Sequence, residues 1–329
     1  MSRPAVTVSC VIEDRDKWFD GAFTLATSLR NLGGRTASAP MEVLFLGSMD
    51  GVFTVPLAAM GVTSRIVERW PGSSRPADRV RALEVPDLEP DAVLIALDHD
   101  VVVLRDLSDA VSSASVRAVP AWESPLRPER WRQLLACVGL APTAGQWLPP
   151  GAKEEVPVPC VESGVLFVPA PMVQPLQSAW GGYIERLDTG GYDLSADELV
   201  HLVEIALSLA LLETAVPLDF LGPEWNFRGH GLAPATTPVR ILHPDAMGPV
   251  TGSPGAGGRV NGGPGAGASA EPAVQDGLSR DIERLNVIVA ARRSQAPREG
   301  PGALVAGAAQ LAAQAVREMG RPSSRGPGS

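Results

Sequence analysis

The chain contains very little lysine. Only Lys17 and Lys153 occur among its 28 basic residues, so the other 26 (28 − 2) are arginines. Chemistry that requires a lysine therefore has two candidates. The 37 acidic residues give a formal net charge of −9 at pH 7. This charge offers no general attraction to nucleic-acid phosphates or to an anionic membrane surface, so we expect neither partner.

Cysteines and long apolar runs are also scarce. Cys10, Cys137 and Cys160 lie far apart and form no Cys-x-x-Cys pair and no zinc spacing, a pattern typical of free thiols in a reducing compartment. The longest apolar run, 205–212, falls far short of the roughly 20 residues of a membrane span. The first residues lack the charged and then apolar order of a secretory signal. We expect a cytoplasmic protein without an integral membrane span.

Short apolar runs alternate with amphipathic stretches up to residue 247. Strands are expected at 6–12, 41–46, 62–67, 92–97, 116–120, 161–168 and 240–242, and helical segments at 19–32, 77–85 and 172–187. Ser195 and Glu198 form a capping box that opens a further helix. This succession predicts an α/β fold, a mostly parallel sheet with flanking helices, over residues 1–247.

The composition changes after residue 247. Glycine and proline dominate residues 248–275, which predicts a flexible linker. Residues 276–319 are predicted to form a C-terminal helical extension, and 320–329 a disordered tail. Apolar residues recur at helical spacing in the extension: Leu278, Ile282, Leu285 and Val289. This first helix either packs back on the domain or mediates a homodimer.

Two carboxylates follow a fully apolar run. Asp98 and Asp100 come directly after residues 92–97, and ligands of α/β sheets bind at the carboxyl ends of strands. Two carboxylates spaced in this way can share a divalent cation, for which Mg²⁺ or Mn²⁺ is suited. The other interpretation of the pair is a solvated acidic turn.

Two chemistries use such a pair. In haloacid-dehalogenase-type phosphatases the first Asp is the nucleophile and the second a general acid. Those enzymes also need a lysine, and the one near the middle of this chain, Lys153, lies in a Gly-Ala-Lys-Glu-Glu loop that does not fit the role. In glycosyl transfer from a sugar nucleotide, the pair instead holds a metal on the diphosphate.

The residues around the pair favour glycosyl transfer. Leu97-Asp-His-Asp-Val-Val-Val-Leu-Arg-Asp106-Leu resembles the Leu-Asp-x-Asp-x-x-Val-x-x-Asp-Leu signature of GT-A glycosyltransferases. The chain is similar over roughly residues 5–248 to the retaining family 8 that includes glycogenin and bacterial lipopolysaccharide galactosyltransferases. The resemblance implies a Rossmann-like GT-A fold. It also implies transfer of a hexose from a nucleotide sugar, a UDP-sugar, to an acceptor that the sequence does not identify.

The resemblance also implies a metal site and a donor site. His243, at the end of the last expected strand, matches the family's third ligand, so Asp98, Asp100 and His243 are implied to bind Mn²⁺ or Mg²⁺. The positions implied to bind the donor are Val11, Glu13, Asp14, Arg79, Arg81, Asp98 and Gly164. Either Arg79 or Arg81 would reach the nucleotide. The family's lysine after Gly248 is absent, and so is its tyrosine after the first strand.

Two further carboxylates are implied to lie near the reacting carbon. Glu162 replaces the Asn of the family's Asn-Ala-Gly strand, and Asp197 matches the start of its Asp-Gln pair. Such carboxylates can stabilise positive charge at the anomeric carbon. The departures from the family pattern leave a second hypothesis open, a catalytically degenerate GT-A module that binds a nucleotide sugar or a partner protein without turnover. A third, a sugar-1-phosphate nucleotidyltransferase, lacks its glycine-rich loop, since residues 11–17 contain no glycine.

Overall fold

The computed structural model describes most of the chain up to residue 243. The described residues are 4–13, 16–71, 75–142, 147–148, 154–190, 192–228 and 238–243, with the single positions 280, 284, 287 and 288. The predicted linker and tail, and all but those four positions of the predicted helical extension, lie outside them. No helix among these residues is long and apolar enough to cross a bilayer.

The elements follow one another in the order that the sequence pattern predicts, with additions. The strands are β1 (Val6–Glu13), β2 (Met41–Leu46), β3 (Val62–Val67), β4 (Val93–Leu97), β5 (Val102–Val103), β6 (Val116–Pro120), β7 (Val161–Pro169), β8 (Leu218–Phe220) and β9 (Ile241–Leu242). The α-helices are α1 (Asp16–Leu32), α2 (Gly51–Ala58), α3 (Pro128–Val138), α4 (Ala170–Asp188), α5 (Ala196–Leu199) and α6 (Leu202–Thr214). The 3₁₀ helices are η1 (Gly34–Ser38), η2 (Arg75–Leu83), η3 (Ser108–Ala110) and η4 (Pro223–Trp225).

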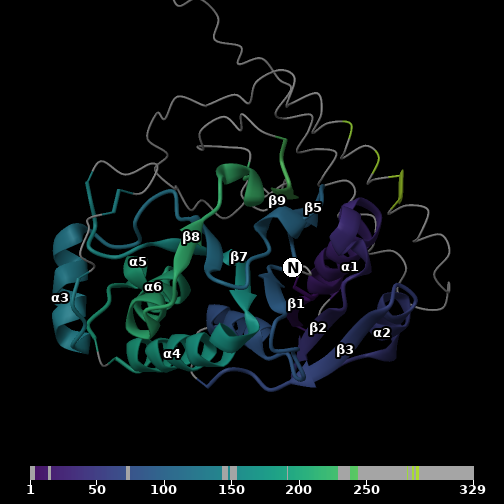
Figure 1. The fold of residues 1–329 in the computed structure, drawn as a ribbon. Helices are drawn as coiled ribbons and strands as arrows, with labels where there is room; N and C mark the ends of the chain where they lie inside the picture. The colour runs from purple at the N-terminus through teal and green to yellow at the C-terminus, as the bar shows by residue number, and fades with distance from the viewer. Residues whose placement is uncertain are drawn as a thin grey trace, which may run out of the picture.

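A seven-stranded sheet runs through the centre of the molecule in the order β3-β2-β1-β4-β7-β6-β8 (Figure 1). Neighbours among β3, β2, β1 and β4 are parallel, and so are β6 and β8. Strand β7 alone runs antiparallel to both of its neighbours, β4 and β6. The predicted α/β fold, a mostly parallel sheet with flanking helices, is confirmed.

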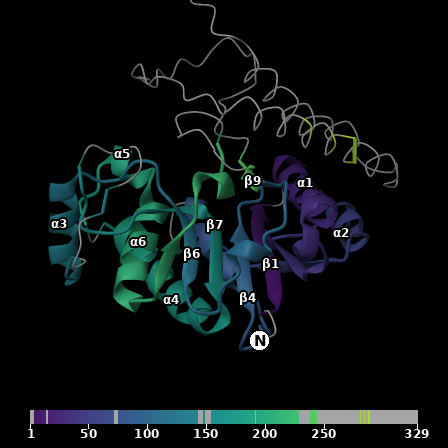
Figure 2. The ribbon, with the colours of Figure 1, turned by 45° about the horizontal axis from the view of Figure 1, so that its top comes forward.

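Both faces of the sheet are covered, which explains why β4 is apolar at every position. Val93, Ile95 and Leu97 belong to the same core as residues of α1 and β2, whereas Leu94 and Ala96 belong to the core of α4 and α6. This alternation follows from the two-residue period of a strand. Figure 2 shows α1 and α2 on one flank of the sheet and α3, α4 and α6 on the other.

The helix expected from Ser195 onward is divided in two. The capping box is confirmed: the Ser195 hydroxyl accepts from the Glu198 amide, and the Glu198 carboxylate accepts from the Ser195 amide. However, α5 ends at Leu199, and His201 has non-helical dihedral angles of φ −105° and ψ 15° before α6 begins. The segment expected at 77–85 is the 3₁₀ helix η2 rather than an α-helix.

The carboxyl ends of β1 to β4 meet the start of β7 at one edge of the sheet, because β7 runs in the opposite direction. Leu97 pairs with Val165, and the Asp98 amide donates to the Gly164 carbonyl at 2.9 Å. The small antiparallel sheet of β5 and β9 brings the chain after β9 to the same edge. Residues separated by more than a hundred positions are thereby brought together here.

The close packing of α4 against Trp70 leads to a first prediction. A Cβ added to Gly181 would overlap the Trp70 ring, whereas one added to the next residue, Gly182, would meet nothing within 4 Å. We expect Gly181→Ala to lower the free energy of unfolding by about 1–3 kcal/mol through overpacking. Gly182→Ala should raise it by about 0.5–1 kcal/mol through helix propensity. Urea denaturation measures both, and equal effects of the two substitutions would contradict this packing.

Candidate metal and donor site

The three side chains implied to bind metal converge where β4, β5 and β9 meet. The imidazole Nε2 of His243 lies 3.2 Å from Asp100 Oδ1 and 4.0 Å from Asp98 Oδ2. One ligand atom from each residue lies within 4.8 Å of the other two. Two carboxylate oxygens and one imidazole nitrogen form a donor set that suits Mn²⁺ or Mg²⁺. The side chains present therefore fit the implied cofactor.

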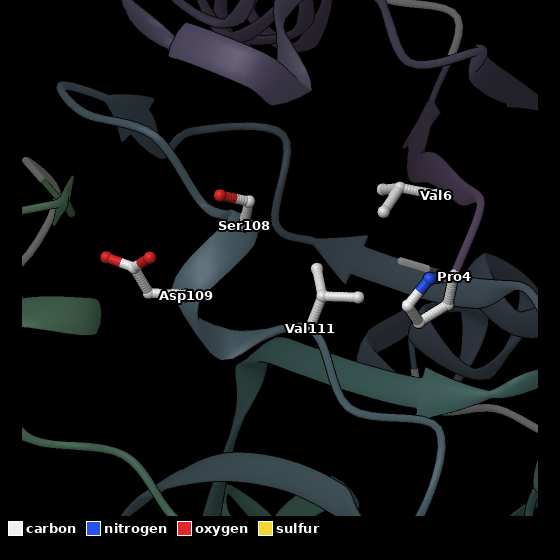
Figure 3. Close-up of a pocket in the computed structure, with 5 residues that line it drawn as sticks. All are labelled: Pro4, Val6, Ser108, Asp109 and Val111. Atoms are coloured by element: carbon white, nitrogen blue, oxygen red, sulfur yellow. The ribbon is translucent and has the colours of Figure 1, made fainter. Parts of the chain in front are cut away.

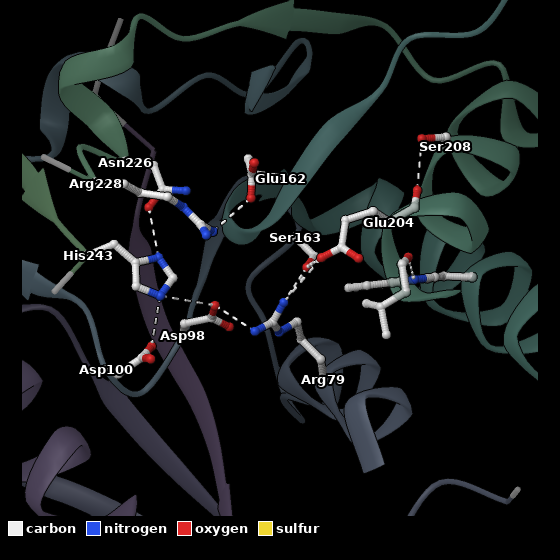
Figure 4. Close-up of polar contacts among 12 residues, drawn as sticks. Arg79, Asp98, Asp100, Glu162, Ser163, Glu204, Ser208, Asn226, Arg228 and His243 are labelled. Carbon is white, nitrogen blue, oxygen red and sulfur yellow. Dashed lines mark hydrogen bonds and ion pairs between the residues drawn. The ribbon is translucent and has the colours of Figure 1, made fainter. Parts of the chain in front are cut away.

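Asn226 fixes the orientation of the His243 ring. Its Oδ1 lies 3.1 Å from His243 Nδ1 (Figure 4). Because an amide oxygen only accepts, Nδ1 carries a proton, and Nε2 is the nitrogen that faces the two carboxylates. Nε2 can meet them either as an imidazolium N–H or as a ligand of a cation that all three residues share. A hydrogen bond on the second ring nitrogen is the usual arrangement around a metal-bound histidine.

Gly164 provides the space in which the Asp98 carboxylate lies. A Cβ at this position would lie 2.6 Å from Asp98 Oδ2 and 3.5 Å from His243 Cε1. Real Cβ atoms do not approach other atoms to the first of these distances, so the carboxylate would have to move. The glycine is required by this close approach and not by its backbone dihedral angles.

Arg79 binds the same Asp98 oxygen that lies 4.0 Å from His243 Nε2. Its Nη2 donates to Asp98 Oδ2 at 2.7 Å, and its Nη1 donates to Ser163 Oγ and lies 3.5 Å from Glu204 Oε1. Burial by itself lowers the pKa of Arg79, but Asp98 and Glu204 outweigh it, so the pKa is raised. Ser163 donates in turn to Glu204 Oε1 at 2.9 Å. Arg79 is thus a permanent cation held between β4, β7 and α6.

Glu162 is paired with an arginine from another segment. Arg228 Nη2 donates to Glu162 Oε2 at 2.8 Å. Burial raises the pKa of the Glu162 carboxyl, while Arg228 acts in the opposite direction. Glu162 lies beside Ser163 near the start of β7, so its carboxylate is at the same edge of the sheet as Asp98.

The remaining donor-site positions occupy different surroundings. Arg81 stacks over the Trp70 ring at 4.6 Å and pairs with Glu84, so of the two arginines only Arg79 contacts Asp98. The Oε1 atom of Glu13, at the end of β1, lies 3.3 Å from Arg69 Nη2. Val11 packs against Leu44, Leu46 and Val67. Asp14 lies outside the described residues.

The structure does not bring Asp197 into this network. Asp197 is exposed on α5, and no hydrogen bond or ion pair among the described residues joins it to Asp98 or to Glu162. The carboxylate that α6 contributes is Glu204, in the first turn of that helix. The pattern gave no sign of Glu204, because its apolar surroundings indicate only a buried helix.

Two other site residues were also missed. Asn226 and Arg228 lie in the sequence Trp-Asn-Phe-Arg before the last strand. Their alternation around the buried Phe227 is a signal for an extended segment with one polar face. Only the pairing of this segment with β9 shows which partners that face meets.

A separate cavity lies at the other end of β1. It has a volume of about 320 Å³ and is lined by Pro4, Val6, Ser108, Asp109 and Val111 (Figure 3). Val6 opens β1 and pairs with Val93, the first residue of β4, so the length of β4 separates this cavity from Asp98. The carboxylate of Asp109 pairs with Arg240 at 2.6 Å. This cavity is therefore distinct from the metal-ligand cluster.

No protein-family model and no curated protein matches the chain. Several solved structures resemble its fold at low identity. Mouse xyloside xylosyltransferase 1 has a TM-score of 0.44 at 14% identity, over 76% of this chain and 100% of that one. Core-mannan synthase A from Aspergillus fumigatus has a TM-score of 0.44 at 12% identity, over 67% and 73%. Glycosyltransferase GlyE from Streptococcus pneumoniae has a TM-score of 0.41 at 14% identity, over 74% of this chain and 54% of that one.

The role of Gly164 can be tested by one methyl group. We expect Gly164→Ala to lower the affinity for Mn²⁺ by about 10- to 100-fold, as for other changes that displace a ligand's support, because the added Cβ displaces Asp98. Gly51→Ala is the matched control, since a Cβ there meets nothing within 4 Å. Calorimetric Mn²⁺ titration measures both variants. Wild-type affinity in a folded Gly164→Ala protein would show that Asp98 does not bind the ion.

Proposed function

We propose that this chain is a metal-dependent glycosyltransferase that moves a hexose from a nucleotide sugar, a UDP-sugar, to an acceptor. The convergence of Asp98, Asp100 and His243 at the carboxyl edge of the sheet is the observation that carries the proposal. This edge is where α/β proteins bind their ligands. The resemblance around Asp98 supplies the reaction class, and the geometry of the cluster supports it.

The charges at the site support a divalent cation. Four carboxylates and two guanidiniums lie together, which leaves 2 − 4 = −2: Asp98, Asp100, Glu162 and Glu204 against Arg79 and Arg228. Asp98 is buried and the other three carboxylates are 20–21% exposed, and an excess of largely buried negative charge is costly unless it is neutralised. A bound Mn²⁺ or Mg²⁺ would supply Lewis-acid stabilisation of the departing diphosphate.

The chain's own residues have separable roles in this proposal. Asp98, Asp100 and His243 would hold the ion, and Gly164 would leave room for the Asp98 carboxylate. Glu162, near the start of β7, would stabilise positive charge that develops at the anomeric carbon. Asp197 remains a proposed contact to donor or acceptor from α5.

The metal role predicts a specific loss of nucleotide binding. We expect wild-type protein to bind UDP only when Mn²⁺ or Mg²⁺ is present, and Asp100→Ala to weaken that binding by about 100-fold or more. Glu129→Ala, which removes an exposed carboxylate on α3, should have no effect. Titration calorimetry with and without the ion measures this. Tight binding of UDP to Asp100→Ala without metal would overturn the metal role.

Turnover separates the enzyme from the binding module. Purified protein with Mn²⁺ and a panel of UDP-hexoses should release UDP slowly by donor hydrolysis even without an acceptor. A UDP-detection assay measures this release, with Asp100→Ala as the inactive control. Metal-dependent binding without any release of UDP would favour the catalytically degenerate module.

A further inference from the structure

Arg228 and Asn226 project from one face of a short extended segment. The Phe227 amide donates to the Ile241 carbonyl, and the His243 amide donates to the Phe227 carbonyl, both at 2.9 Å. Phe227 is buried. Asn226 Oδ1 lies 3.1 Å from His243 Nδ1 and Arg228 Nη2 lies 2.8 Å from Glu162 Oε2, so both side chains lie on one side of this segment. Figure 4 shows this side directed toward the metal-ligand cluster and Glu162.

Both side chains retain hydrogen-bond donors. Among the described residues, the Nε of Arg228 and the Nδ2 of Asn226 are buried atoms without a partner. Asn226 is 2% exposed as a residue, so water reaches its amide poorly. Buried N–H groups without partners are rare in folded proteins, because each loses its hydrogen bonds to water. The Nε atoms of Arg65, Arg81 and Arg117 are also buried without a hydrogen-bond partner in the described part of the chain. It is therefore the position of the Arg228 and Asn226 donors at the edge of the site that points to a bound acceptor.

The two guanidiniums of the site differ in how fully they are occupied. Arg79 contacts Asp98, Ser163 and Glu204. Arg228 contacts Glu162 through Nη2, although the side chains of both arginines are equally exposed, at 34%. A guanidinium has five N–H donors in a fork that matches a phosphate or carboxylate. Arg79 could bind an incoming anion only by giving up its contacts to Asp98 and Glu204, whereas Arg228 would give up only its contact to Glu162 of β7.

We propose that Arg228, assisted by the Asn226 amide, is the phosphate-binding residue of this site. When a nucleoside diphosphate binds, Arg228 exchanges its ion pair with Glu162 for an ion pair with the phosphate. This inference rests on the proposed function, because it names the group of the donor that this part of the site binds. When the bond between the anomeric carbon and the diphosphate oxygen breaks, the electron pair goes to the diphosphate. A guanidinium at that oxygen stabilises the added negative charge.

Calorimetric titration of UDP in saturating Mn²⁺ tests the proposal. We expect Arg228→Gln to raise the Kd for UDP on the order of tenfold, as for the loss of a hydrogen bond to a charged group. Arg228→Lys should raise the Kd by less, because lysine keeps the positive charge but lacks the forked N–H donors of a guanidinium. Glu162→Gln should lower the Kd, because it weakens the competing ion pair. The Mn²⁺ affinity measured without nucleotide should not fall in Arg228→Gln, because the substitution removes a positive charge from the site.

The exposed pair of Arg132 and Glu129 on α3 supplies matched controls. Arg132→Gln and Glu129→Gln should leave the Kd for UDP unchanged. An unchanged Kd in folded Arg228→Gln, or a Kd that rises in Glu162→Gln, would overturn the proposal. If Arg228→Gln does not fold, Arg228→Lys and Glu162→Gln decide it.

The outcome for wild-type protein separates this inference from the proposed function. If wild-type protein binds neither UDP nor GDP in the presence of Mn²⁺, the proposed function fails and the inference fails with it. If it binds one of them and Arg228→Gln binds it equally well, only the inference fails. Where GDP and not UDP binds, the same titrations are made with GDP.

Discussion

The hydrogen bond from the Asp98 amide to the Gly164 carbonyl holds the end of β4 against the start of β7. Because β7 is antiparallel to β4, the residues that open β7 lie beside the residue that closes β4. Asp98 can approach this closely only because Gly164 has no side chain. Ser163 and Glu162 then follow by position, one toward Arg79 and the other toward Arg228. The site is therefore built outward from a single strand pairing.

Much of the sheet could be predicted from hydrophobic periodicity. All seven expected strands form, and β4 shows why: a strand buried on both faces has an unbroken apolar run that ends at its first charged residue, Asp98. Strands β5 and β8 were missed, and two or three residues are too few to show a period; β9 is as short as β5 and was nevertheless expected, so length is not the whole reason. Helices α2 and α3 were missed as well, and the break at His201 depends on tertiary packing that propensity does not record.

The site was predictable where its chemistry is local in sequence. Asp98 and Asp100 share one motif, and His243 was found only through the family resemblance. Arg79 could not be distinguished from Arg81, since both lie on η2, and only packing against Trp70 separates them. Glu204 and Arg228 carry no motif at all. Their place in the site depends on α6 and on the segment beside β9, which is long-range information that one sequence does not contain.

The third metal-ligand side chain depends on the smallest element of the fold. His243 follows β9, a strand of two residues that pairs with the equally short β5. So little hydrogen-bonded structure gives this ladder a low free energy of local opening compared with the central sheet. An ion that bridges Asp98 and His243 would close a loop of about 145 residues, so that part of its binding free energy would be spent on ordering β9. Ion affinity and the local stability of this ladder are thereby linked. A change that stabilises the ladder would raise the affinity for the ion, and binding of the ion would stabilise the ladder.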